Sequence, residues 1–190
     1  RGELSSLDPL ASAVLEQAPE TAIDRSASDP LSVWFMPMTA GILRSVERSI
    51  CKLLVHQQSG WTVNAMSGMA ATLYVALFSS YREHTQAFRG SNPTWLKAPK
   101  DSKERIRISR EAIEGGFLQA INRITTLYEA PTRNLLNASP GEIKLADATK
   151  TIPSAPVDCV LTSPPYCTRI DYTTATRIEL AIIDSLLRVD

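Results

Sequence analysis

A short apolar run that ends in a proline pair constrains this chain more than any other feature. Residues 157–162 (VDCVLT) have the length and the near-continuous apolar character of a strand covered on both faces, as in a parallel sheet. Ser163-Pro164-Pro165-Tyr166 follows directly. Two prolines fix two φ angles and remove two backbone donors, so this loop is stiff. The pattern predicts an α/β sheet with a loop at the carboxyl end of a buried strand, where ligands bind in such sheets.

The rest of the chain has mostly helical patterning. Apolar residues recur at helical spacing, weakly at first and then strongly, in residues 4–17, 37–60, 62–88, 103–129 and 173–188. A Pro- and Asn-containing stretch near residue 140 separates the long helices from the strand-like sequence. We therefore expect a helical subdomain or insertion at residues 1–140 and part of an α/β core at residues 141–190.

Composition excludes several classes of protein. Twenty basic residues balance twenty acidic ones, so the net charge does not indicate any class of binding partner. Cys51, Cys159 and Cys167 are odd in number and lack CxxC spacing, which predicts neither a disulfide framework nor a metal site. We expect Cys159 to be a small core residue of the buried strand. No apolar stretch has the length of a membrane span, and a bacterial cytoplasm fits best.

The proline loop has the residue types needed to activate an amino group. The exocyclic nitrogen of a base is a poor nucleophile because its lone pair is delocalised into the ring. Two acceptors, the Ser163 hydroxyl and the Pro164 carbonyl, would bind both amino hydrogens and aim the lone pair at a methyl donor. Tyr166 would stack on a base flipped out of the duplex. A plain turn or a polyproline-type segment is the alternative reading.

Ser163-Pro164-Pro165-Tyr166 resembles motif IV of the amino-methyltransferases, in which the Ser form is commonest in the N4-cytosine branch. The resemblance implies a partial Rossmann-like core, S-adenosyl-L-methionine (AdoMet) as cofactor, and methyl transfer to N4 of a flipped cytosine in DNA. N6-adenine is the close alternative, RNA is a further possible substrate, and a non-catalytic helical subunit that binds DNA or supports assembly is another alternative.

Two flanking segments extend the resemblance. The strand-like residues 142–146 end at Asp147, which looks like the acidic residue of motif III that reaches the cofactor adenine, although Ala146 replaces the usual glycine. Asp147 as a turn residue is the other reading. Downstream, residues 169–172 and the following helix are similar to bacterial members in which a helical segment interrupts the core.

Motif I, the GxG sequence that holds the amino-acid end of AdoMet, is not found in these residues. Gly115-Gly116 does not qualify because it lies inside a helical pattern and follows no strand. We expect motif I upstream of Arg1; a position after Asp190, or a second chain that supplies it, are the alternatives.

A basic run provides the best candidate for contact with DNA phosphates. Asp101 and Glu104 offset only part of its charge. The candidate DNA-binding residues are Lys97, Lys100, Lys103, Arg105 and Arg107. A solvated surface without a partner is the alternative for such a run.

Overall fold

The computed structural model describes residues 6–20, 29–55, 66–90, 96–129, 146–147, 149–150, 156–163 and 172–187. Contacts between residues divide the chain into two units, one made of Arg1–Glu129 with Asp171–Asp190 and the other of Ala130–Ile170. The first unit is helical and contains the hydrophobic core.

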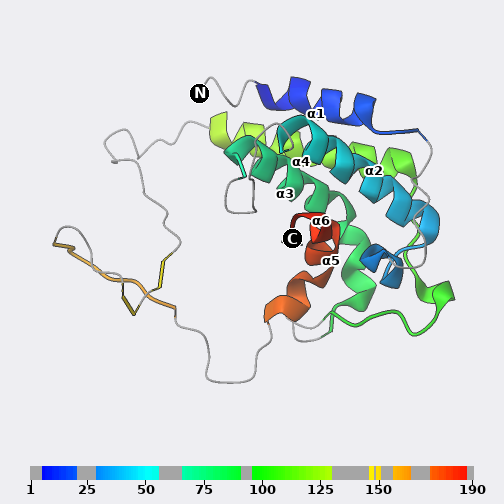
Figure 1. Cartoon of the computed structure of the whole chain (residues 1–190). Coiled ribbons are helices and arrows are strands. Elements are labelled where there is room, and N and C mark those ends of the chain that lie inside the picture. Colours follow the sequence, from blue (N-terminus) through cyan, green and yellow to red (C-terminus); the bar gives the residue numbers. More distant parts are fainter. Residues whose placement is uncertain are drawn as a thin grey trace. The chain divides into compact units, whose positions relative to one another are not determined.

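The helical unit is built of α-helices, with short 3-10 helices between some of them (Figure 1). In chain order its elements are α1 (Leu7–Gln17), η2 (Pro30–Val33), α2 (Pro37–Leu54), α3 (Gly68–Arg82), η4 (Glu83–Phe88), η5 (Ser102–Glu104), α4 (Arg110–Glu129), η6 (Tyr172–Thr176), α5 (Arg177–Ile182) and α6 (Asp184–Leu187).

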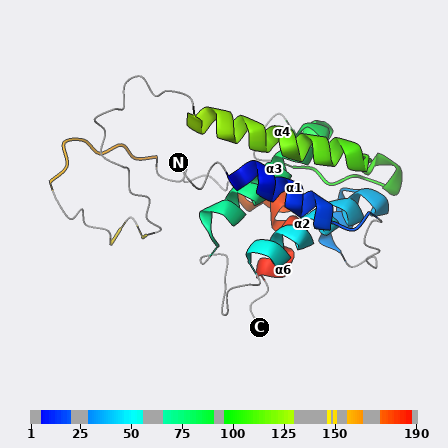
Figure 2. The ribbon, with the colours of Figure 1, turned by 90° about the horizontal axis from the view of Figure 1, so that it is seen from above.

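Four helices form the body of this unit. α3 packs along α4 and against α2, and α1 lies across both α4 and α2 (Figures 1 and 2). On α4, Ile113, Phe117 and Ile121 follow one another at four-residue steps, so they share one helical face, and all three are fully buried. The helical periodicity of the sequence predicted these three positions correctly, but Leu127, which it placed on the same face, is 66% exposed.

The two adjacent glycines of α4 have different surroundings. A Cβ added at Gly116 would lie 3.1 Å from the Cα of Ser80 on α3, whereas one added at Gly115 would meet nothing within 4 Å. Gly116 therefore permits the close approach of α4 to α3. Gly115 has no such role, and the helix continues through both residues.

α2 is buried along most of its length, including residues that the sequence pattern placed on a polar face. Arg44 and Glu47 lie between the apolar positions of this helix, yet their side chains are 1% and 2% exposed. The helix is surrounded by neighbours because α1, α3, α4, α5 and η2 all pack against it. Its charged side chains must therefore find partners inside the protein.

The Arg44 guanidinium joins three segments of the chain. Its Nε and one terminal nitrogen donate to the carboxylate of Asp29, at 3.1 and 3.0 Å. Its other terminal nitrogen donates to Glu47 one turn along α2. The two terminal nitrogens of the guanidinium also donate to the backbone carbonyls of Ala181 and Ile182, at 2.9 and 2.6 Å. Both of these residues lie at the end of α5. A cation there also complements the negative end of the helix dipole.

A second set of contacts surrounds the Glu47 carboxylate. Ser185 on α6 donates to Glu47 Oε1 at 3.1 Å, and the Tyr74 hydroxyl on α3 lies 3.4 Å from the same oxygen. Apolar packing completes the attachment, since Ile178, Ala181, Ile182 and Leu186 are buried as their helical spacing predicted. The C-terminal helices are thus part of the helical unit, and the boundary expected near residue 140 does not coincide with this division.

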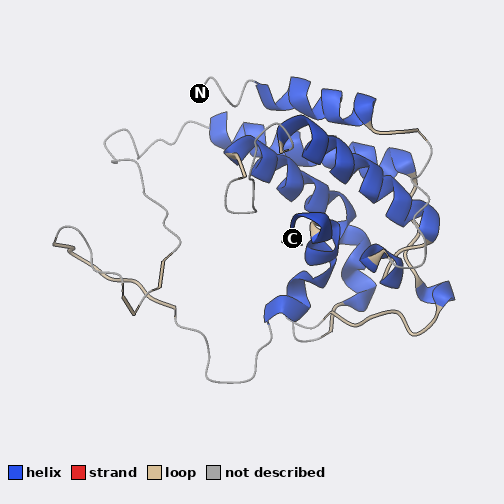
Figure 3. Ribbon diagram, viewed as in Figure 1, coloured by secondary structure: helices blue, strands red, loops and turns tan. Residues whose placement is uncertain are grey.

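The expected α/β Rossmann-like core is wrong for this structure. Among the described residues none forms a strand, and β-pairing is limited to isolated bridges of Phe35 with Ile106 and of Arg89 with Leu96 (Figure 3). Residues 157–162, expected as a buried strand, are exposed, with Val160 at 75% and Leu161 at 98%. An apolar run becomes a strand only where neighbouring strands pair with its backbone and helices cover its faces.

The other expected strand, residues 142–146, lies outside the described residues except for Ala146, which is exposed. The expected helices are present with changed limits. The pattern at residues 103–129 forms a helix only from Arg110, and the pattern at 173–188 is divided at Ile183.

The Arg44 contacts predict a large effect of substitution. Arg44→Met leaves the carboxylates of Asp29 and Glu47 buried without their cation, so we expect the free energy of unfolding to fall by about 3–5 kcal/mol. Arg48→Met, at an exposed position of the same helix, is the control and is expected to change it by less than about 0.5 kcal/mol. Urea unfolding followed by circular dichroism measures both; equal stabilities would contradict the role of Arg44.

The glycine pair gives a second prediction. Gly115→Ala should raise the free energy of unfolding by about 1 kcal/mol, because alanine is the better helix former and its methyl group meets open space. Gly116→Ala should be less stable than Gly115→Ala, because its methyl group presses on the backbone of Ser80. Thermal unfolding of the two variants compares them, and the opposite order would show that α3 and α4 are not in close contact at this point.

Candidate functional site

The proline loop is described in the structure only at its first residue. Ser163 ends the described segment 156–163 and is exposed. Pro164, Pro165 and Tyr166 lie outside the described residues. The expected roles of the loop therefore stay predictions, with an exposed Ser163 as the one structural observation on it.

Asp147 stabilises its own turn. Its Oδ1 accepts from the backbone nitrogen and the hydroxyl of Thr149, at 2.9 and 2.7 Å. Its Oδ2 lies 3.4 Å from the Nζ of Lys150. The hydrogen bonds from Thr149, with a smaller contribution from Lys150, lower the pKa of this carboxyl below its usual range. Asp147 is exposed and lies in this turn, and its expected contact with the cofactor adenine stays a prediction.

The basic run occupies the connector between η4 and α4, which is held to the helical unit at both ends. At its start the backbone nitrogen of Lys97 donates to the carbonyl of Phe88 at 2.8 Å. Near its end Ile106 exchanges two backbone hydrogen bonds with the segment before α2, at 2.8 and 2.9 Å. Ile108 then donates to the Thr39 hydroxyl and accepts from it. The position of the connector is therefore fixed.

Extended backbone at the end of the connector separates its charged and apolar side chains. Ile106 and Ile108 are buried, whereas Arg107 is exposed and Arg105 is half-buried. Successive side chains of extended chain point to opposite sides, so the two arginines share the outer side. Lys97, Lys100 and Lys103 are exposed as well.

The buried cluster around Glu47 was not identified from the sequence. It contains groups that often take part in catalysis, but burial makes them unreactive. Burial, with the Glu47 carboxylate nearby, raises the pKa of the Cys51 thiol to about 11 and raises that of the Tyr74 hydroxyl as well. Both groups stay protonated at neutral pH. The cluster is therefore a structural one.

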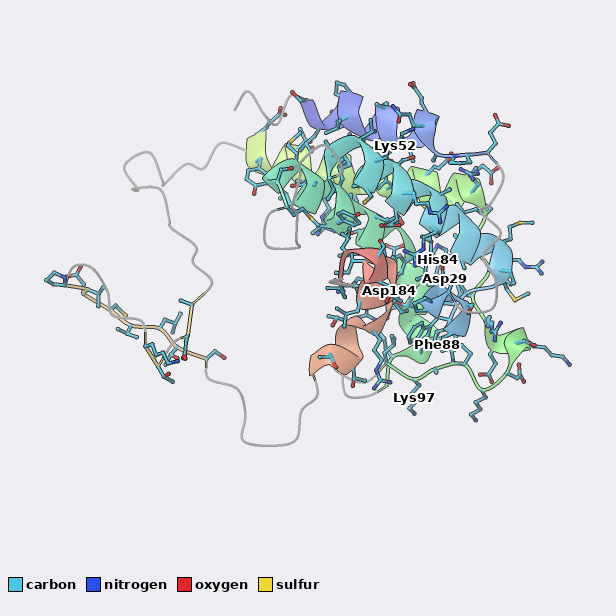
Figure 4. The ribbon with its side chains drawn as sticks, in the orientation of Figure 1. Asp29, Lys52, His84, Phe88, Lys97 and Asp184 are labelled. Atoms are coloured by element: carbon cyan, nitrogen blue, oxygen red, sulfur yellow. The ribbon has the colours of Figure 1, made fainter. Side chains whose placement is uncertain are left out.

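A groove of about 950 Å³ runs between α3 and α4. Gly116 lies within it, and Val75 and Leu118 leave part of its wall apolar and exposed. His84, which is labelled in Figure 4, is exposed and lines part of the groove.

Comparison with known proteins gives no significant match, whether to protein-family models, to curated proteins or to solved structures. Of the helices that the structure describes, none is long and apolar enough to cross a membrane. Within the same residues no group of three or more His, Cys, Asp or Glu side chains is arranged to hold a metal ion.

The reactivity of the cysteine thiols tests whether residues 157–162 are exposed or form a buried strand. Cys159 is exposed, contrary to the expectation from the sequence, and Cys51 is buried. In a Cys167→Ser background we predict that one thiol, Cys159, reacts rapidly with Ellman's reagent in the folded protein, while Cys51 reacts only after unfolding. Absorbance of the released thiolate counts the reactive groups. A native protein with no fast-reacting thiol would contradict the exposed placement of residues 157–162.

Proposed function

We propose that this chain carries the base-holding loop of an AdoMet-dependent DNA methyltransferase that acts on an exocyclic amino nitrogen, N4 of cytosine in preference to N6 of adenine. The observation that carries the proposal is the order of residues Ser163-Pro164-Pro165-Tyr166. A bacterial restriction-modification system in the cytoplasm would be its setting.

The chemistry of the loop supports the proposal. Ser163 and the carbonyl of Pro164 accept the two amino hydrogens, and Tyr166 supports the flipped base. Catalysis is then positioning and electrostatic stabilisation without a covalent intermediate. An exposed Ser163 is accessible to an extruded base, as this role requires. The prolines precede Tyr166 and not Cys167, so the loop lacks the Pro-Cys nucleophile that a C5-cytosine mechanism needs.

The methyl donor enters the proposal through the resemblance alone. AdoMet would supply an electrophilic methyl group when bound, and contact of Asp147 with its adenine is part of what the resemblance implies. Donor binding is therefore tested separately, by calorimetric titration of the full chain with AdoMet. Heat of binding supports a catalytic role, whereas no heat supports the non-catalytic alternative.

Substitutions in the loop test the base-holding role. Ser163→Ala should lower methyl transfer by about a hundredfold or more, as loss of one positioned polar group does at comparable sites. Tyr166→Ala should lower it by about tenfold to a hundredfold, because one stacking contact with the base is worth about 1–3 kcal/mol. Ser154→Ala, a serine outside the motif, is the matched control and should keep activity. Methylated bases are measured by digesting the DNA to nucleosides and analysing the nucleosides by mass spectrometry.

The same measurement identifies the base. N4-methylcytosine is the expected product, and N6-methyladenine alone would overturn the choice of cytosine while keeping the loop chemistry. Full activity in both loop variants would refute the assignment of the site.

A further inference from the structure

We propose that the connector between η4 and α4 is a preformed surface that binds the backbone phosphates of a nucleic acid duplex. Its cations are Lys97, Lys100, Lys103, Arg105 and Arg107. The inference stands apart from the proposed methyl transfer, because a protein can bind phosphates through this surface whether or not it has a complete catalytic site.

The five connector cations have no acidic partners within the part of the chain that the structure describes. The next cation along the chain, Arg110, differs because it pairs with Glu114 at 3.0 Å and donates to the carbonyl of Pro19. Arg110 therefore stabilises the start of α4, whereas the connector cations are available to an outside anion.

The two acids inside the run, Asp101 and Glu104, accept hydrogen bonds from the backbone of the connector itself. Asp101 Oδ1 accepts from the backbone nitrogens of Lys103 and Glu104, at 2.7 and 3.2 Å. Glu104 Oε2 accepts from the backbone nitrogen of Lys100 at 2.8 Å. Both carboxylates are thus used to fold the connector itself around η5. They shape the surface and leave the ends of its lysine and arginine side chains unpaired.

The backbone of the connector is held in place before any partner binds. Backbone hydrogen bonds tie the connector to Phe88 at one end and to Trp34 and Met36 at the other. Buried Leu96, Ile106 and Ile108 fix its inner side. Because the backbone is held before binding, less conformational entropy is lost when phosphates are bound.

A duplex fits this surface better than a membrane does. Binding to a membrane surface combines basic side chains with apolar ones that enter the lipid. Here the large apolar side chains that the structure describes in the connector are buried on the inner side, and lysines and arginines occupy the outer side. Arginine also matches phosphate geometry with paired donors. The surface therefore fits an array of phosphates without base readout.

The test compares two charge-matched triple variants of the full chain. The first, Lys103→Gln, Arg105→Gln and Arg107→Gln, removes three connector cations. The second, Arg48→Gln, Lys52→Gln and Arg123→Gln, removes three exposed cations of α2 and α4 that also lack ion pairs within the described structure. Figure 4 shows Lys52 of α2 and Lys97 of the connector at well separated places in the view.

Fluorescence anisotropy with a labelled 20-base-pair duplex of arbitrary sequence, at several salt concentrations and without AdoMet, gives the affinity and its salt dependence. If every connector cation neutralises one phosphate, the logarithmic salt slope is about −4 to −5. The connector variant should lower its magnitude by about 3 and weaken binding at least tenfold in low salt. The control variant should change the slope by less than about 0.5, and circular dichroism melts should show that all three proteins stay folded.

Several results would overturn the proposal. One is the absence of duplex binding in low salt, and another is equal weakening by both variants, which would reflect net charge alone. Tighter binding to anionic phosphatidylserine vesicles than to the duplex would assign the surface to membranes.

The proposed catalytic loop is tested independently of this surface. Loss of methylation in Ser163→Ala with unchanged duplex binding would support a phosphate-binding surface that is separate from the loop.

Discussion

The rest of the helical unit depends on the burial of one guanidinium group. Removing an arginine from water is unfavourable by several kcal/mol unless its donors are satisfied. Arg44 satisfies them with two carboxylates and two carbonyls, which come from the segment before η2, from α2 itself and from the end of α5. Since each donor has a fixed direction, these contacts specify how the three segments meet. Apolar packing supplies stability around them but less orientation.

This arrangement determines where the C-terminal helices belong. α5 and α6 follow the proline loop in the sequence, yet they complete the core built by the first 129 residues. Residues 130–170 are therefore joined at both ends to one helical unit. In the sequence, the candidate base-holding residues Ser163 to Tyr166 lie in this intervening segment.

The connector shows how the same unit presents charge. Its apolar side chains contribute to the core, its two acids fold its backbone, and its five cations remain on the outer side. The sequence alone identified the cations as a candidate surface. Only the structure shows that the acids between them are engaged with backbone groups, because hydrogen bonds of this kind leave no pattern in the composition.

The sequence by itself predicted the helices, the buried face of α5 and the buried positions Ile113, Phe117 and Ile121 of α4, because periodicity acts over a few residues. The chemistry of Ser163 to Tyr166 stays a prediction from the sequence. It did not determine the environment of a segment. Residues 157–162 have the composition of a buried strand but are exposed, and Arg44 and Glu47 have the composition of a polar face but are buried. A local pattern cannot specify which distant segments will cover it. Tertiary structure decided these points, because burial depends on partners far away in the chain, such as the carbonyls of Ala181 and Ile182 that receive the Arg44 guanidinium.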